Sequence, residues 1–346
     1  MSAHTFFSHE AVQPRKAVSF RVLLALYAII PFCILLQLLD TAFWQQALRQ
    51  SLPSSPNHFV LFQFLFGTPH IVASSIILLS NPEYLSFFRR KLAGMTLALA
   101  VFFGIGSLFL PYRAFYVIVA AWTVYHVLRQ QQGIVRNLCR LPAWAFHLML
   151  WISVAAGLLV YLGIFLKNSL QPPQVEWLQH AAGALSLGLV FSSLLSQRYV
   201  HDDLGRWLLW SNTLLVLSSF YLYVQQYYFL AILVPRLVHD ATAYIVYVIH
   251  DYNKHGSHPK NTLYRVGKHL KLPVWLVLPL FSFGLAFVLQ NYGDTLFNQL
   301  AQVWGVPGGK AVSVGLIGYL ALMHYYSEAF TWKKDSPYRK YIAFTR

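Results

Sequence analysis

The chain has 346 residues, of which 57% are hydrophobic and only 11% charged, with a mean hydropathy of +0.50. An ordinary soluble domain has about 25% charged residues, so this composition excludes one and indicates an integral membrane protein. The net charge of +15 does not indicate nucleic-acid binding, because the basic residues stand in short segments between apolar runs, where they set orientation in the membrane.

Ten apolar segments approach the roughly 20 residues that a transmembrane helix needs. In chain order they are 19–40, 58–80, 92–110, 113–132, 143–166, 177–196, 207–225, 228–250, 273–291 and 310–330. A polar lead-in, 1–18, precedes the first segment, and no signal-peptide cleavage pattern follows that segment. We therefore predict an all-α integral membrane protein, a single polytopic bundle of about ten transmembrane helices.

The basic residues predict the orientation of this bundle. If both termini are cytoplasmic, 21 of the 26 Lys and Arg residues fall in cytoplasmic segments, including the loop 251–272 and the tail 331–346. Such an excess is typical of cytoplasmic loops, so we predict cytoplasmic termini and a location in the inner (cytoplasmic) membrane of the cell. Cys33 and Cys139 indicate neither a disulfide framework nor a thiolate metal site.

Eight of the fourteen histidines fall within predicted spans, but His58, His147 and His180 lie at or near span ends, where an interfacial position is expected. The five that remain are His70, His126, His239, His250 and His324. All but His250 lie roughly 11–14 residues from the outer end of their spans, and at about 1.5 Å per residue they fall within roughly 5 Å of one depth. A single buried histidine is often only bonded to a neighbouring helix, but four at one depth are harder to explain in that way. Since intramembrane ionisable residues are costly and imidazole is the commonest protein metal ligand, we predict a metal site.

Helical spacing adds candidate partners for these histidines. His324 and Glu328 are four residues apart and share a helix face, so both can bind one metal, or the glutamate can bridge two. Gln130 stands in the same relation to His126. His250 lies eleven residues after His239, about 16 Å along a straight helix, so it belongs to a second site, supports the first, or lies on a broken helix.

Further polar residues lie in or just after the span 228–250. Arg236 stands one turn before Asp240, and this pair is either structural or an anchor for an anionic substrate group. Asp240 or Asp251 can orient a ligating imidazole, as carboxylates near metal sites do. Tyr244 is either interhelical packing or a redox group. We predict catalytic roles for Glu328, Asp240 and Tyr244, cofactor-binding roles for Gln130, Arg236 and Asp251, and metal ligation by the five histidines and Glu328.

Three short stretches resemble the Brp/Blh-like family of membrane β-carotene dioxygenases: GTPH ending at His70, YHVLRQQ around His126, and YVIH ending at His250. The chain also looks like the broader class of histidine-rich integral-membrane non-haem iron oxygenases, although it lacks the HxxxH and HxxHH boxes of membrane desaturases. The acidic residue that commonly follows the PHG stretch of the family is replaced by PHIVASS, and HYYSEAFTWK has no counterpart. The resemblance implies a histidine-ligated iron in a helical bundle.

These patterns predict an O₂-dependent iron enzyme, a hydroxylase, desaturase or dioxygenase, with one or two irons. Its expected partners are the lipid bilayer, a lipophilic small-molecule substrate, O₂ and, for some of these reactions, an electron donor. One alternative is a haem or copper redox protein, although covalent c-type haem is excluded because no C-x-x-C-H motif is present. The other is a proton- or metal-coupled transporter that uses the buried ionisable groups as a relay.

Overall fold

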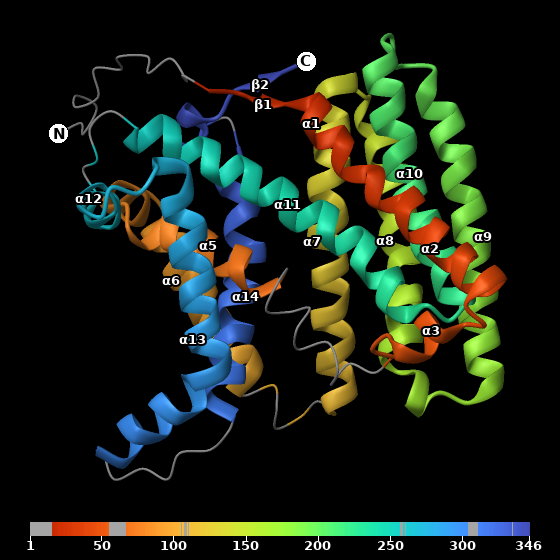
Figure 1. The fold of residues 1–346 in the computed structure, drawn as a ribbon, viewed down its shortest axis with the longest axis horizontal. Helices are drawn as coiled ribbons and strands as arrows, with labels where there is room; N and C mark the ends of the chain where they lie inside the picture. The colour runs from red at the N-terminus through yellow and green to blue at the C-terminus, as the bar shows by residue number, and fades with distance from the viewer. Residues whose placement is uncertain are drawn as a thin grey trace.

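The computed structural model describes residues 16–54, 67–104, 106, 109, 111–256, 259, 261–303, 311–333 and 335–346. Most of the predicted lead-in, the start of the predicted span 58–80, the end of 92–110, the start of 310–330 and part of the loop 251–272 lie outside the described residues. The described residues are almost entirely helical, which confirms the predicted all-α class for this part of the chain (Figure 1).

The elements follow one another in a simple order. They are β1 (Val18–Ser19), α1 (Phe20–Ala25), η1 (Leu26–Ala28), α2 (Ile29–Phe43), α3 (Ala47–Ser51), α5 (Thr68–Leu79), α6 (Pro82–Gly104), α7 (Tyr112–Cys139), α8 (Ala143–Phe165), η5 (Lys167–Ser169), α9 (Pro172–Gln197), α10 (Asp203–Val224), α11 (Tyr228–His255), α12 (Thr262–His269), α13 (Val274–Val303), α14 (Ala311–Thr331), η6 (Pro337–Tyr341) and β2 (Phe344–Thr345).

Six helical segments of the described residues are long and apolar enough to cross a membrane. They are Phe20–Phe43, Ala143–Phe165, Pro172–Gln197, Asp203–Val224, Tyr228–His255 and Val274–Gly293. A seventh span results if α5 and α6, which meet at an angle of 106°, are counted together. The protein is therefore a multi-pass membrane protein by these features, and the count of ten spans stays a prediction.

α11 is the central element of the bundle. It runs obliquely across the molecule, with α7 to α10 on one side and α5, α6, α13 and α14 on the other (Figure 1). It packs against α2, α5, α7, α10 and α13. Side chains on different faces of α11 therefore reach both halves of the bundle.

A proline lies inside α11 without ending it. Pro235 has no N–H, so it leaves the carbonyl of Ala231 without its helical partner. The hydroxyl of Ser219, on α10, donates to that carbonyl at 2.7 Å. A side chain of a neighbouring helix thus satisfies the carbonyl, which is how proline is tolerated in membrane helices.

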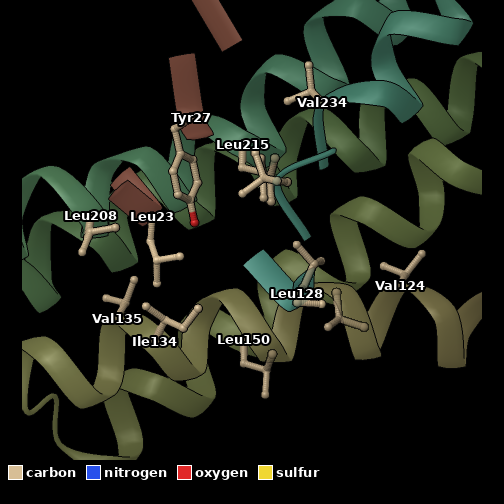
Figure 2. Close-up of a cluster of buried hydrophobic side chains, with 14 of the residues drawn as sticks. Leu23, Tyr27, Val124, Leu128, Ile134, Val135, Leu150, Leu208, Leu215 and Val234 are labelled. Atoms are coloured by element: carbon tan, nitrogen blue, oxygen red, sulfur yellow. The ribbon is translucent and has the colours of Figure 1, made fainter. Parts of the chain in front are cut away.

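The apolar core of the α7–α11 half contains a buried polar connection. Figure 2 shows Tyr27 of η1 among leucine and valine side chains, including Leu208 and Leu215. Its hydroxyl donates to Oε1 of Gln131 at 3.0 Å and accepts from Nδ2 of Asn212 at 2.8 Å. These bonds tie η1 to α7 and α10, because each buried polar group here needs a partner.

The described ends of the chain meet on one side of the bundle. β1 and β2 pair in parallel, with Val18 opposite Phe344 (Figure 1). Asn253, near the end of α11, donates to the backbone carbonyls of Lys16 and Tyr341, each at 2.8 Å. Both end segments therefore lie on the same side, and the cytoplasmic identity of that side stays a prediction.

Two segments predicted as a loop and a tail contain ordered structure. α11 continues to His255, and α12 follows with its first turn capped by Asn261, whose side chain accepts from the amide of Leu263 at 2.8 Å. The tail 331–346 contains η6 and β2 and buries Tyr338 against the bundle. The loop begins at Gly256 rather than at Asp251, because residues 251–255 contain no proline or glycine and the helix continues through them although they are polar.

Candidate metal centre

Four helices bring four of the predicted histidines together: His70 from α5, His126 from α7, His239 from α11 and His324 from α14. His70 lies with its ring centroid 5.2 Å from that of His239 and 4.8 Å from that of His324. His126 closes the ring, at 4.8 Å from His239 and 4.9 Å from His324. The four imidazoles therefore form one cluster, at a common level of the bundle, as the depth comparison predicted.

The four imidazole rings have little or no solvent-exposed surface. His70 and His239 have no exposed surface, and His324 and His126 are 1% and 7% exposed. Buried polar groups are costly unless they are bonded to something, so the partners of each ring nitrogen decide what the cluster can do.

The closest pair of ring nitrogens is Nε2 of His70 and Nε2 of His324, which lie 3.1 Å apart. Two neutral imidazoles at this distance form a hydrogen bond if one Nε2 carries a proton. If neither does, two lone pairs face each other and the arrangement needs a cation. Imidazole nitrogens lie about 2.0–2.1 Å from Zn²⁺, so two neighbouring ligands of such an ion stand about 3 Å apart.

The outer nitrogens of these two rings decide between the alternatives. Nδ1 of His324 lies 2.7 Å from Oγ of Ser74, whose own proton goes to the carbonyl of Ile71 at 3.0 Å. Ser74 Oγ therefore accepts from His324, which places the His324 proton on Nδ1. Nδ1 of His70 lies 3.1 Å from Oδ1 of Asp240, which is a contact between charges rather than a hydrogen bond, because neither oxygen of Asp240 has a hydrogen-bond partner among the described residues. A carboxylate at this distance still favours a proton on the facing nitrogen.

This assignment of protons, inferred from the neighbouring groups, leaves both facing Nε2 atoms with lone pairs. The pair is then repulsive unless a positive ion lies between or beside the nitrogens. A histidine that gives its outer N–H to a carboxylate or hydroxyl and its other nitrogen to a metal is the usual arrangement in protein metal sites.

The other two histidines also present nitrogens to the cluster. Among the residues that the structure describes, neither ring nitrogen of His239 has a hydrogen-bond partner, nor does Nε2 of His126. Unpaired nitrogens on rings this deeply buried are rare in folded proteins unless a metal, ion or water satisfies them. The residues present therefore fit a metal ion.

Glu328 adds a carboxylate to one side of the cluster. Its Oε2 lies 3.5 Å from Nε2 of His126 and 3.4 Å from Nε2 of Gln130, which donates to it. Its Oε1 accepts from the hydroxyl of Tyr247. These contacts orient Glu328 toward His126 with an oxygen on the side of the histidines, so it can serve as a ligand.

Two sets of three ligand atoms lie close enough to share a metal. His70, His239 and His324 form one set, and His126, His324 and Glu328 form the other, with the atoms of each set within 4.8 Å of one another. His324 belongs to both sets. The geometry accommodates one ion at the centre or two neighbouring ions.

The predicted pair of Arg236 and Asp240 is present beside the cluster. Nε of Arg236 lies 3.3 Å from Oδ2 of Asp240, and both side chains are buried or nearly so. The arginine balances the carboxylate that contacts His70, so this pair supports the tautomer of His70. Arg236 is therefore placed to act through Asp240, which separates it from the histidine.

His250 is not part of the four-histidine cluster. Its Nε2 lies 2.7 Å from the hydroxyl of Tyr84 and its Nδ1 lies 2.7 Å from Oδ1 of Asp251. Its ring stacks on Tyr338 at 4.0 Å. With both nitrogens already partnered, His250 has none left for a metal, and it lies about three turns from His239, as the spacing predicted.

Asp251 belongs to the same second cluster, where Tyr264 donates to its Oδ2. Tyr264 in turn stacks on His255, with ring centroids 4.4 Å apart. Burial and the negative charge of Asp251 raise the pKa of both Tyr264 and Tyr338, so these tyrosines keep their protons. The predicted cofactor-binding role of Asp251 is not supported by this position.

Tyr244 faces another helix. Its hydroxyl lies 2.8 Å from Oγ of Ser282 and its ring stacks on Phe283, both on α13. The structure therefore places it in interhelical packing, one of the two roles left open for it. Sequence reasoning missed Ser74, although it lies four residues after His70 on the same helix face.

Comparisons with known proteins do not change this description, because no protein-family model, curated protein or solved structure matches the chain. A function can therefore be inferred only from the geometry and chemistry of the metal centre.

Proposed function

We propose that the protein is a membrane-embedded, histidine-ligated non-haem iron oxygenase that acts on a lipophilic substrate. The observation that carries the proposal is the 3.1 Å contact between Nε2 of His70 and Nε2 of His324, whose outer nitrogens lie beside Asp240 and Ser74, respectively. With the protons on the outer nitrogens, this contact favours a cation between or beside the two rings. The two unpaired nitrogens of His239 and the carboxylate of Glu328 complete a set of ligands.

The composition of this set favours iron. Imidazoles suit iron, copper, zinc and nickel, and histidines combined with a carboxylate are typical of non-haem iron oxygenases. Iron with open coordination positions supplies O₂ activation when it is bound. A hydroxylase or desaturase also needs an external electron donor, whereas a dioxygenase does not, because both oxygen atoms enter the product. The substrate class is lipophilic because the site lies inside an apolar bundle.

The surrounding side chains have defined tasks in this proposal. Ser74 bonds to Nδ1 of His324, and the carboxylate of Asp240 lies beside Nδ1 of His70, so both residues favour protons on the outer nitrogens. Tyr247 and Gln130 hold Glu328 by its two oxygens. The rings of His70, His239 and His324 are shielded from water, which strengthens the electrostatic contacts on that side of the site.

Haem is a poorer fit to the same site. A haem with two axial histidines needs the porphyrin plane between their nitrogens. Here Nε2 of His70 and Nε2 of His324 are only 3.1 Å apart, and the other rings pack edge-on around them. The geometry therefore favours a bare metal ion.

Metal analysis and optical spectroscopy of the purified full-length protein test the proposal. We expect stoichiometric iron, no Soret band, and consumption of O₂ when a lipid extract and a reductant are added. A Soret band would indicate haem, and stoichiometric copper without iron would indicate a copper protein. Protein with no bound metal would contradict the proposal and favour the transporter.

A further inference from the structure

A cavity reaches the proposed metal site from one end of the bundle. It has a volume of about 370 Å³ and is lined mainly by α7 and α14. His126 and Glu328 are among its lining residues, so it communicates with the carboxylate side of the cluster. Pockets for small molecules have volumes of about 300–1,000 Å³, so this one has the size of a binding site.

The cavity is elongated along α7. Its lining residues on this helix extend from Trp122 past His126 to Asn137. The eleven residues between His126 and Asn137 correspond to about 16 Å along the helix axis. A compact substrate would not need this length, whereas an extended chain would.

The walls of the cavity are largely aromatic. Trp122 and Tyr125 line it from α7, Tyr325 and Tyr326 from α14, and Trp332 from the residue after α14. Tyr325 also stacks on the ring of His126, with centroids 4.5 Å apart. The ring faces offer apolar surface to a hydrocarbon chain, while the hydroxyls of Tyr125 and Tyr325 accept from Arg129 and Thr123.

The charges along the cavity are mainly of one sign. Arg129, Lys333 and Arg339 line it, and Glu328 is the only acidic residue among the described lining residues. Glu328 already accepts from Tyr247 and Gln130 at the histidine end. Lys333 and Arg339 follow the end of α14, so they lie toward the end of the cavity that is away from the histidines. Burial lowers the pKa of Arg339, but a guanidinium stays protonated in proteins.

We propose that this cavity binds an amphiphile with an anionic oxygen head group, such as a carboxylate or a phosphate, on a long hydrocarbon chain. Lys333 and Arg339 bind the head group, and the aromatic walls direct the chain toward His126 and Glu328. This inference rests on the proposed function, because the end of the hydrocarbon chain that reaches His126 and Glu328 is where the oxygenase would react.

Binding is testable without turnover, because Trp122 and Trp332 line the cavity. A chain brominated near its methyl end quenches tryptophan fluorescence on binding. The probes are brominated hexadecanoic acid, the lysophosphatidic acid with the same chain, and the corresponding neutral alcohol, each added to full-length protein in a neutral maltoside detergent. Metal content is measured in the same preparations. The double variant Trp122→Phe/Trp332→Phe reports whether the quenched tryptophans are those that line the cavity.

We expect at least one of the two anionic probes to bind about tenfold more tightly than the alcohol, because charge-assisted hydrogen bonds contribute about that factor. The acid that binds more tightly identifies the preferred head group as a carboxylate or a phosphate. The double variant Lys333→Gln/Arg339→Gln removes this preference and leaves binding of the alcohol unchanged. Arg136→Gln, on α7 but outside the cavity lining, keeps it.

Equal binding of acids and alcohol, or a preference that survives the double variant, would overturn the inference. Unchanged quenching in Trp122→Phe/Trp332→Phe would place the probe outside the cavity and also overturn it. The proposed function is judged separately by metal content. If metal-free protein still prefers the acids, this inference stands and the proposed oxygenase function is rejected. If iron-loaded protein shows no preference, the oxygenase function stands and this inference is rejected.

Discussion

Ser74 and His324, on α5 and α14, lie 250 positions apart in the chain with Oγ 2.7 Å from Nδ1. Because this hydroxyl also bonds to the carbonyl of Ile71, it favours a proton on Nδ1 of His324, which leaves the lone pair of Nε2 facing His70. A single polar residue of α5 thus decides whether two imidazoles form a hydrogen bond or a ligand pair.

Ser74→Ala should weaken metal binding by about 10- to 100-fold, the usual effect of removing a hydrogen-bond partner of a ligating histidine. The measurement is a competition titration of the protein with a chelator of known affinity. Ser75→Ala is the matched control, because Ser75 also donates to the carbonyl of Ile71 and no contact of its side chain with a histidine is found among the described residues. Equal affinities for the two variants would remove Ser74 from the site.

Arg236→Met should destabilise the metal-free protein by about 3–5 kcal/mol, because it leaves the buried carboxylate of Asp240 without its partner. The second substitution Asp240→Asn should recover much of this loss, since no unpaired charge then remains. Unfolding of both proteins in mixed detergent measures the difference. If the single and double variants were equally unstable, the pair would not be an electrostatic unit.

Ser219→Ala should cost about 1 kcal/mol, because it removes the donor to the carbonyl of Ala231 that Pro235 leaves unbonded. The same substitution in a Pro235→Ala background should cost less, since the alanine N–H bonds that carbonyl instead. Ser218→Ala is the control, because Ser218 bonds to its own helix through Leu215. Additive effects of Ser219→Ala and Pro235→Ala in this double-mutant cycle would contradict the assignment.

His250→Gln should leave the metal content unchanged and lower stability by about 1–3 kcal/mol, because it breaks the bonds to Tyr84 and Asp251 in a buried cluster. Metal analysis and thermal unfolding of the same preparation separate the two effects. A loss of metal in this variant would return His250 to the set of ligands.

Much of the metal centre could be predicted from the sequence because depth along a helix is linear in residue number. His70, His126, His239 and His324 lie on four predicted spans, and counting residues from one membrane face brings them to one level. The spacing rule likewise separated His250 from His239. Neither step needs knowledge of which helices are neighbours.

The second cluster could not be predicted in this way. Tyr84 and His250 are 166 positions apart, on α6 and α11, and no periodicity relates them. Tyr338 comes from a segment that looked like a polar tail, yet it stacks on His250. Hydropathy also predicts 58–80 and 92–110 as two separate spans, and it cannot show that α5 and α6 meet at 106° with two residues between them and pass together as one candidate span.

The iron content of His324→Ala, compared with that of the wild-type protein and of His180→Ala, tests whether the buried histidines bind iron. His324 belongs to both sets of candidate ligands, whereas His180 is exposed on α9. We expect the wild-type protein and His180→Ala to purify with stoichiometric iron. We expect His324→Ala to insert into the membrane and to purify without iron. Full iron in His324→Ala would contradict the claim that these histidines form the metal centre.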